Sequence, residues 1–244
     1  MTDFSSIREQ SIRITKDKIR ESVNEDDYII KAINNIEELA KQTNSLTKRM
    51  RDWYNLYLPE FSKLASDNEG FVNQAIEKDR NQLMKEMKLD LSMGKDLETE
   101  HLEPILQLGN TIKEMFQLRE KLKKYLDKIV ESHCKNMYTI TGYLLGAKLI
   151  ESAGSLKRLA MMPASTIQML GAEKALFRHL KTGAKPPKHG IILQHPLVSG
   201  SKRQDRGKSA RMFADKISLA AKTDYFKGEF IGDKLKEELE AKLK

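Results

Sequence analysis

The 244-residue chain has very little cysteine and no long apolar run. Cys134 is its single cysteine, which excludes an internal disulfide framework and fits a reducing compartment. No apolar stretch approaches the ~20 residues that a membrane-spanning helix needs, and the amino terminus MTDFSSIREQ contains no signal-type apolar segment. We therefore expect a soluble, intracellular protein without a membrane partner.

Aromatic residues, glycine and proline are also scarce. Aromatic residues make up 7% of the chain and charged residues 32%, and there are only 13 Gly and 6 Pro. This composition is typical of long helices with much exposed surface rather than of a compact sphere. We predict an all-α protein of one large or two modest domains.

Acidic residues are scarce in one part of the chain. The net charge is +8, but residues 132–228 contain 17 Lys and Arg against five Asp and Glu, whereas residues 1–131 contain 22 against 25. Such a basic block is the electrostatic pattern of a domain that binds a polyanion, because Lys and Arg near phosphates release condensed counterions. The charge distribution favours nucleic acid as the partner.

Two heptad-like patterns predict a long antiparallel coiled-coil arm over residues 26–133. The first consists of Ile29, Ile33, Ile36, Ala40, Thr43, Thr47, Met50, Tyr54 and Tyr57. The second, interrupted only by Arg119, consists of Ile105, Leu108, Ile112, Met115, Leu122, Leu126 and Ile129. We expect the second set to mediate dimerisation, although an antiparallel pair within one chain would satisfy much of the same pattern.

The segment between the two patterns is predicted to form shorter helices at the tip of the arm, over about residues 60–100. Pro59 should stop the first long helix, and Gly70 should break the segment. Its Met-rich stretch LMKEMKLDLSMGKD is typical either of adaptable core packing or of a partner-binding surface.

The remaining residues predict a compact helical module over 134–232, preceded by a helical approach segment (1–25) and followed by a charged tail (233–244). Pro163 should start a helix that runs through Leu170 and is ended by Gly171. The next helix, AEKALFRHLK, should be closed by Gly183. A last helix is expected from about residue 201 to Thr223.

A basic stripe is the first candidate binding feature of this module. Lys174, Arg178 and Lys181 share one face of the predicted helix, and Leu176, Phe177 and Leu180 occupy much of the other side. An ordinary solvated face would mix charges of both signs, so phosphate contact is favoured. The small residues Gly171 and Ala172 should leave the first backbone amides open to an anion. A second cluster around the next helix consists of Lys202, Arg203, Arg206, Lys208 and Arg211.

The segment KPPKHGIILQHP, residues 185–196, follows no helical or strand period. Its two prolines stiffen the backbone and present Lys185 and Lys188, and the apolar run 191–193 should anchor the loop. We assign His189 to stacking or hydrogen bonding with an unpaired base and His195 to a structural hydrogen bond. A histidine pair acting in RNA cleavage stays an alternative. Neither this pair nor His133-Cys134 has further ligands nearby, so no metal or other cofactor is expected.

Three stretches of the sequence resemble the Nop domain family. They are MPASTIQMLGAEKALFRHLKTGAKPPKHGIILQHPLV (162–198), RGKSARMFADKISLAAKTDYFKGEFIG (206–232) and, in the arm, RDWYNLYLPEF (51–61). The likeness covers about residues 10–232. In form the chain looks most like the archaeal members, which are scaffolds of box C/D ribonucleoproteins.

The resemblance implies a non-catalytic scaffold. It implies binding to a box C/D guide RNA at a kink-turn together with the small protein bound there, self-association through the coiled coil, and support of guide-directed 2′-O-methylation. A separate amino-terminal domain that holds fibrillarin is missing from this sequence, so fibrillarin is expected as a partner only where that domain is present. The protein should be cytoplasmic in an archaeon and nucleolar in a eukaryote.

Motif position and charge together give the predicted RNA-binding set. It consists of Gly171, Ala172, Glu173, Lys174, Arg178, Lys181, Lys185, Lys188, His189, Arg203, Arg206 and Lys208. A pre-mRNA splicing scaffold that uses the same surface is the alternative within the family. A nuclease and a purely structural coiled-coil protein are the alternatives outside it.

Overall fold

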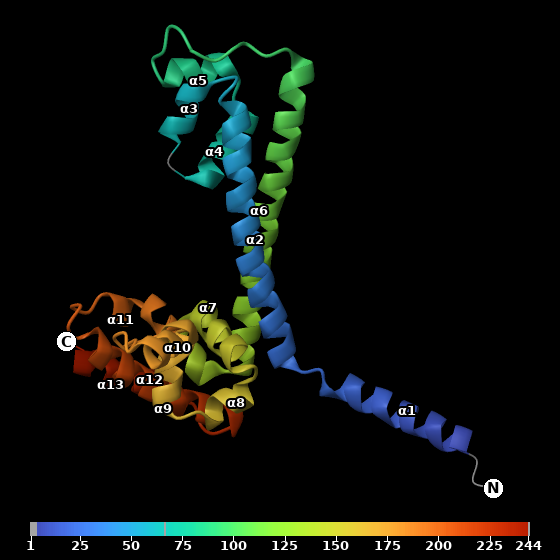
Figure 1. Cartoon of the computed structure of the whole chain (residues 1–244), viewed down its shortest axis with the longest axis vertical. Coiled ribbons are helices and arrows are strands. Elements are labelled where there is room, and N and C mark those ends of the chain that lie inside the picture. The colour runs from blue at the N-terminus through green and yellow to red at the C-terminus, as the bar shows by residue number, and fades with distance from the viewer. Residues whose placement is uncertain (1–3, 66, 244) are drawn as a thin grey trace. The chain divides into compact units, whose positions relative to one another are not determined.

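The structure, a computed structural model, describes residues 4–65 and 67–243. Every regular element in these two ranges is helical, which confirms the predicted all-α fold (Figure 1). The chain forms two compact units. Unit 1 comprises residues 1–33 and 125–244, and unit 2 comprises residues 34–124.

Unit 2 is built on two long helices that lie side by side and antiparallel (Figure 1). They are the segments within unit 2 of α2 (Glu25–Tyr54) and α6 (Thr99–His133). Positions of the first predicted pattern are buried here, including Ile36, Met50 and Tyr54. Thr43 and Thr47 are buried as well, because each hydroxyl donates a hydrogen bond to a backbone carbonyl one turn earlier in α2.

Three short helices complete unit 2: α3 (Pro59–Leu64), α4 (Asn68–Glu77) and α5 (Arg80–Glu86). Together with α2 and α6 they enclose one apolar core that contains an aromatic cluster of Tyr54, Tyr57, Phe61 and Phe71. Helix α4 lies alongside α6, since Lys113 and Arg119 of α6 both reach carboxylates of α4. The helical insertion therefore packs against the side of the long pair.

Pro59 and Gly70 do not have the helix-breaking roles that the sequence predicted. Helix α2 ends at Tyr54, and Pro59 occupies the first turn of α3, where its missing amide hydrogen is harmless. Gly70 lies inside the first turn of α4 and does not break the segment. Its amide donates to the carboxylate of the N-cap residue Asp67, which is where the helix begins.

The predicted dimerisation set is largely used within the chain. Ile105, Ile112 and Leu126 are completely buried in a single chain, so the assignment of these three to a dimer interface is wrong. The physical reason is that the intramolecular helix pairing satisfies the heptad-like pattern by itself. The other members of the set are half-buried: Leu108, Met115, Leu122 and Ile129.

Unit 1 is organised around α12 (Arg206–Tyr225). This helix packs against α7 (Lys135–Ala153), α8 (Leu156–Met161) and α9 (Ala164–Met169). Its inward face is completely buried and consists of Phe213, Ala214, Ile217, Ala220 and Ala221. Small alanines alternating with larger residues let the neighbouring helices approach closely.

The predicted charged tail is an integral helix of unit 1. Helix α13 (Gly232–Leu243) packs against α7 and α12, and Leu235 and Leu239 are buried there. The Lys216 ammonium of α12, whose side chain is only 9% exposed, lies 2.5 Å from the Glu238 carboxylate of α13. The description of this segment as a tail was therefore wrong, because two apolar positions on one helix face are buried against the module.

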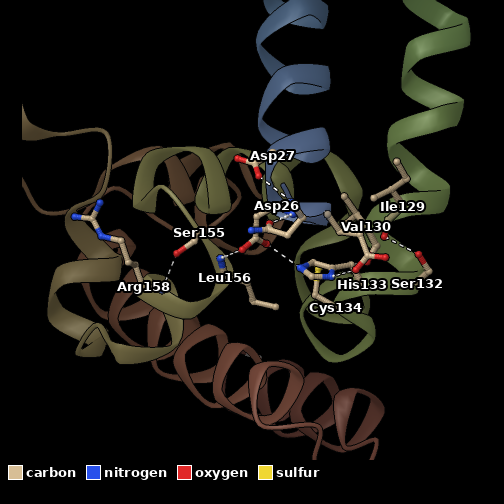
Figure 2. A network of polar contacts seen from close by, with 12 residues as sticks. Asp26, Asp27, Ile129, Val130, Ser132, His133, Cys134, Ser155, Leu156 and Arg158 are labelled. Carbon is tan, nitrogen blue, oxygen red and sulfur yellow. Dashed lines mark hydrogen bonds and ion pairs between the residues drawn. The ribbon is translucent and has the colours of Figure 1, made fainter. Parts of the chain in front are cut away.

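A polar network that joins α2, α6 and α8 explains why the arm boundaries predicted at residues 26 and 133 fall inside unit 1. Figure 2 shows His133, at the end of α6, beside Asp26 from the start of α2. Glu25 Oε2 lies 3.0 Å from His133 Nδ1. Asp26 Oδ1 lies 2.8 Å from His133 Nε2, and Asp26 Oδ2 accepts a hydrogen bond from the Leu156 amide of α8 at 3.0 Å. One carboxylate thus ties three helices together.

The carboxylate of Asp224 caps α7 from a distant part of the chain. It accepts hydrogen bonds from the Asn136 amide at 3.0 Å and from the Met137 amide at 2.8 Å. The residue at the N-cap position, Cys134, makes no side-chain cap; its thiol is buried and donates to the Val130 carbonyl. Burial raises the pKa of this thiol, so it is held protonated.

The amino-terminal approach segment forms helix α1 (Phe4–Ser22), in which no residue is buried. Among the residues that the structure describes, no helix combines the length and the apolar character that crossing a membrane requires.

Candidate nucleic-acid interface

The predicted basic helix is α10 (Glu173–Thr182), and a tight turn at Gly171 connects it to α9. Gly171 adopts φ = 79°, in the left-handed region, and a Cβ there would lie 2.2 Å from the side chain of Ile191. Gly183 ends α10 in the left-handed conformation, as the sequence predicted. The two glycines fix where the basic helix begins and ends.

The proline-containing loop after α10 is fastened to the end of α9. The Gly190 amide donates to the Gln168 carbonyl, and the Ile191 amide donates to the Leu170 carbonyl, both at 2.8 Å. The Gln168 side-chain amide donates in turn to the Lys188 carbonyl at 2.6 Å. The apolar run then forms a 3₁₀ turn, η1 (Ile191–Gln194), in which Ile192 is completely buried. The predicted anchor is therefore present, and it positions Lys188 rigidly.

Helix α10 exposes both of its faces. Lys174, Arg178 and Lys181 are exposed, as are Lys185 and Lys188 of the loop. The apolar side is exposed as well: Phe177 is 60% and Leu180 69% accessible, and α10 has no buried residue. An amphipathic helix whose apolar side faces solvent offers a contact surface beside its cations.

The two backbone amides just before α10 are bonded within the protein. The Gly171 amide donates to the Glu173 carboxylate at 2.7 Å, and the Ala172 amide donates to the Met169 carbonyl at 2.9 Å. Ala172 is buried. The Gly171 and Ala172 amides are therefore not open to an anion, and Glu173 holds the turn. The expected anion site at the first amides of α10 itself stays a prediction.

The second basic cluster adjoins the loop. A Cβ on Gly207, in the first turn of α12, would lie 3.5 to 3.9 Å from the aliphatic stem of Lys188. This contact brings the loop next to the exposed cations Lys202, Arg203 and Lys208. Arg206 is half-buried, and its guanidinium donates to the Ser199 and Ser201 carbonyls at 3.1 and 3.3 Å. Arg206 therefore has a structural role, and its RNA contact stays a prediction.

The two histidines of the loop differ. His195 Nδ1 accepts a hydrogen bond from the Leu197 amide at 3.3 Å, and its ring lies 4.5 Å from that of Phe213. Burial lowers the pKa of His195, and the charge of Lys236 lowers it further, so the ring is neutral at physiological pH. This is the structural hydrogen bond that the sequence predicted. His189 is half-buried.

The exposed cations of this surface lack acidic partners. Within residues 4–65 and 67–243, no ion pair joins a carboxylate to Lys174, Arg178, Lys181, Lys185, Lys188, Lys202, Arg203 or Lys208. We call these eight residues the basic surface. Because like charges repel one another, such a concentration favours binding of a polyanion.

Sequence reasoning missed one cation near this surface. Lys242 of α13 lies at the edge of a cavity that Lys202 and Lys208 also line. The residue had been assigned to the tail. The spacing of Leu235, Leu239 and Lys242 was the available signal, because steps of four and three keep these side chains on neighbouring parts of one helix face.

Comparisons with known proteins agree with the resemblance seen in the sequence. The Nop family, described as "snoRNA binding domain, fibrillarin", matches residues 35–244. A NOP5 family protein of Methanocaldococcus jannaschii is 40% identical over 96% of this chain and 60% of its own length. Nucleolar protein 58 of Schizosaccharomyces pombe is 34% identical over 90% of the chain and 45% of its own length. Human nucleolar protein 56 is 31% identical over the whole chain and 46% of its own length.

The chain thus spans about half the length of the curated relatives that it matches. Among solved structures, a crystal structure of a fibrillarin/Nop5p complex contains a chain with a similar fold. The TM-score is 0.59 at 24% sequence identity, and the match covers 98% of this chain and 77% of that one.

Proposed function

The chain belongs to the Nop family, and on this premise we propose that it is an RNA-binding scaffold of a box C/D ribonucleoprotein. In this proposal, unit 1 recognises a kink-turn RNA together with the small protein already bound to it. The observation that carries the proposal is the basic surface: eight exposed cations without acidic partners among the residues that the structure describes, on elements whose positions are fixed by hydrogen bonds. The family description as an snoRNA-binding domain supports the choice of RNA as the polyanion.

The exposed apolar side of α10 supports a composite partner. RNA phosphates complement Lys174 and Arg178, but they do not complement Phe177 and Leu180 on the same helix. Exposed aromatic and aliphatic side chains in a polar setting favour contact with a protein. We assign this side of α10 to the small kink-turn protein, so that one helix contacts both components.

An electrophoretic shift experiment tests the composite binding mode. The full chain is titrated against a box C/D kink-turn RNA, either naked or already bound by the small protein. The proposal predicts a further shift of the preformed complex at protein concentrations that leave the naked RNA unshifted. Failure to shift the preformed complex even at low salt contradicts the proposal.

A double variant and a matched control test the contact of α10 with the small protein. Phe177→Ser with Leu180→Ser should weaken the shift of the preformed complex and leave the fold intact, because neither side chain is buried. Leu219→Ser is the matched control, since Leu219 is also exposed (42%) but lies on α12. Equal losses in the control and in the α10 variant would remove the protein contact from the proposal.

The activity of the assembled particle extends the proposal. The chain would serve guide-directed 2′-O-methylation as a frame, with fibrillarin as the methyltransferase partner and self-association through unit 2. The similarity to a chain crystallised with fibrillarin agrees with such an assembly at the level of fold. Because Ile105 and Ile112 are buried in one chain, self-association would have to use other side chains of unit 2. Sedimentation of the full chain over a concentration series tests this point, and a monomer at every concentration contradicts it.

A further inference from the structure

A cavity of about 540 Å³ lies at the start of α12, between the turn that precedes this helix and the end of α13. Three lysines line it. Lys202 comes from the turn, Lys208 from the first turns of α12, and Lys242 from the last turn of α13. The cavity is therefore assembled from segments that are about forty residues apart in the sequence.

The charge of the cavity is one-sided. Among the described residues that line it, Asp205 is the only acid. In the part of the chain that the structure describes, no ion pair joins this acid to any of the three lysines. Three lysines that line one cavity concentrate positive charge there, and a bound anion offsets that charge.

The wall of the cavity is held by hydrogen bonds that do not involve the lysines. The Ser201 and Ser209 hydroxyl oxygens lie 2.8 Å apart, and the Ser201 hydroxyl donates to the Leu197 carbonyl at 2.9 Å. Arg206 fixes the same turn through the Ser199 and Ser201 carbonyls. The turn is thus ordered by the protein alone, whereas the ammonium groups stay available. Such preorganisation lowers the entropic cost of binding a ligand.

We propose that this cavity is a phosphate-binding site, in which Lys202, Lys208 and Lys242 neutralise the phosphate and Arg206 acts as a positioning residue. Lysine suits this ligand because its ammonium is a compact point charge that contacts phosphate oxygens without a fixed orientation. The volume of the cavity exceeds that of a phosphate group.

The proposal rests on the proposed function, because RNA is the expected source of the phosphate. It adds α13 to the RNA-binding elements and gives Lys242 a specific role. A phosphodiester of the RNA backbone and free inorganic phosphate share the same chemistry, and the experiment distinguishes them.

The first arm measures RNA affinity over a salt series. Lys202→Ala and Lys242→Ala are compared with wild type in the full chain bound to the kink-turn RNA and its small protein. Each substitution should make the slope of log affinity against log salt shallower by about one, as expected for one lost phosphate contact. Lys234→Ala is the matched control: it removes the same charge from the same helix at an exposed position that does not line the cavity. Lys242→Arg should retain the wild-type slope.

The second arm uses inorganic phosphate without RNA. The melting temperature is measured in sodium phosphate and in sodium chloride at equal ionic strength. A rise in phosphate that Lys202→Ala and Lys242→Ala both abolish supports the site with free phosphate as the ligand. Altered salt slopes without such a rise support the site with the RNA backbone as the ligand. Wild-type behaviour of both variants in both arms overturns the proposal, even if the α10 variants show that the chain binds RNA. Loss of RNA binding in every protein, wild type included, contradicts the proposed function instead, and the phosphate arm still decides the site.

Discussion

The two units use their positive charges in opposite ways. In unit 2, Lys78, Lys113 and Arg119 each approach a carboxylate, and Arg80 is also stacked near the ring of Tyr57. In unit 1, the eight cations of the basic surface are exposed and have no such partner among the described residues. These four cations of unit 2 therefore belong to the fold, whereas those of the basic surface are available to a ligand.

The contrast holds inside unit 1 as well. Lys216 and His133 are largely buried and paired with carboxylates, and both join one helix to another. A cation's partners, rather than its unit, thus decide what it does. Net charge alone indicated that the basic block binds a polyanion, but only the structure separates the available cations from the structural ones.

The largest expected effect is on Arg80. Its guanidinium donates to the Gly94 carbonyl at 2.5 Å, and its side chain is only 15% exposed. Arg80→Ala should lower the free energy of unfolding by about 2–3 kcal/mol, since a charged hydrogen bond and the packing over Tyr57 are lost together. Urea denaturation measures the change. Lys85→Ala, an exposed cation of the same helix, is the control, and an equal loss there would contradict the structural role of Arg80.

The opposite result is expected for the basic surface. Lys174→Ala combined with Arg178→Ala should leave the free energy of unfolding within about 0.5 kcal/mol of wild type, because both side chains are exposed. The same double variant should weaken RNA binding about tenfold at moderate salt. Filter binding and urea denaturation on one preparation give both values. Lys157→Ala with Lys222→Ala removes two other exposed cations of unit 1 and should change neither.

A pH effect is expected from His133. Its hydrogen bond to Asp26, together with Glu25, raises the pKa of the imidazole, although burial opposes this. A raised pKa in the folded state means that the stabilisation is complete below pH 6.5 and is lost as the pH rises through the folded-state value. Wild type should therefore lose stability as the pH rises over that range. His133→Gln should remove this dependence; a wild-type pH profile in the variant would rule out His133 as the group responsible.

The smallest effect is expected for Lys41. Its ammonium lies 3.8 Å from the Glu38 carboxylate, and both side chains are more than half exposed. Exposed pairs one turn apart contribute little, so Lys41→Ala should change the free energy of unfolding by less than about 0.5 kcal/mol. RNA binding should be unchanged. A larger loss of stability or of RNA affinity would contradict this. It would show that the distance between a cation and its nearest carboxylate does not by itself separate structural cations from those available to a ligand.

The sequence predicted the features that depend on local periodicity. Burial of Ile29, Ile33 and Met50 followed from the heptad-like spacing, because that spacing places side chains on one helix face. The end of α10 at Gly183 followed from glycine's freedom to adopt positive φ. These features require no knowledge of distant parts of the chain.

Features that depend on distant contacts were missed. Asp224 caps α7 across 88 residues, and nothing in the local sequence around either segment indicates it. The amide of Gly171 could be predicted to be sterically accessible, but not to be taken by Glu173. Similarly, Arg206 looks like its neighbours Arg203 and Lys208 in sequence, and only its contacts with two carbonyls set it apart.

The salt dependence of RNA binding tests the central claim most directly. Affinity for the kink-turn RNA with its small protein is measured from low to moderate salt for wild type, Lys174→Ala/Arg178→Ala and the unit 2 variant Lys85→Ala. If the basic surface neutralises phosphates, the slope of log affinity against log salt becomes shallower by about two in the double variant and stays unchanged in Lys85→Ala. Identical slopes in all three proteins would contradict the account.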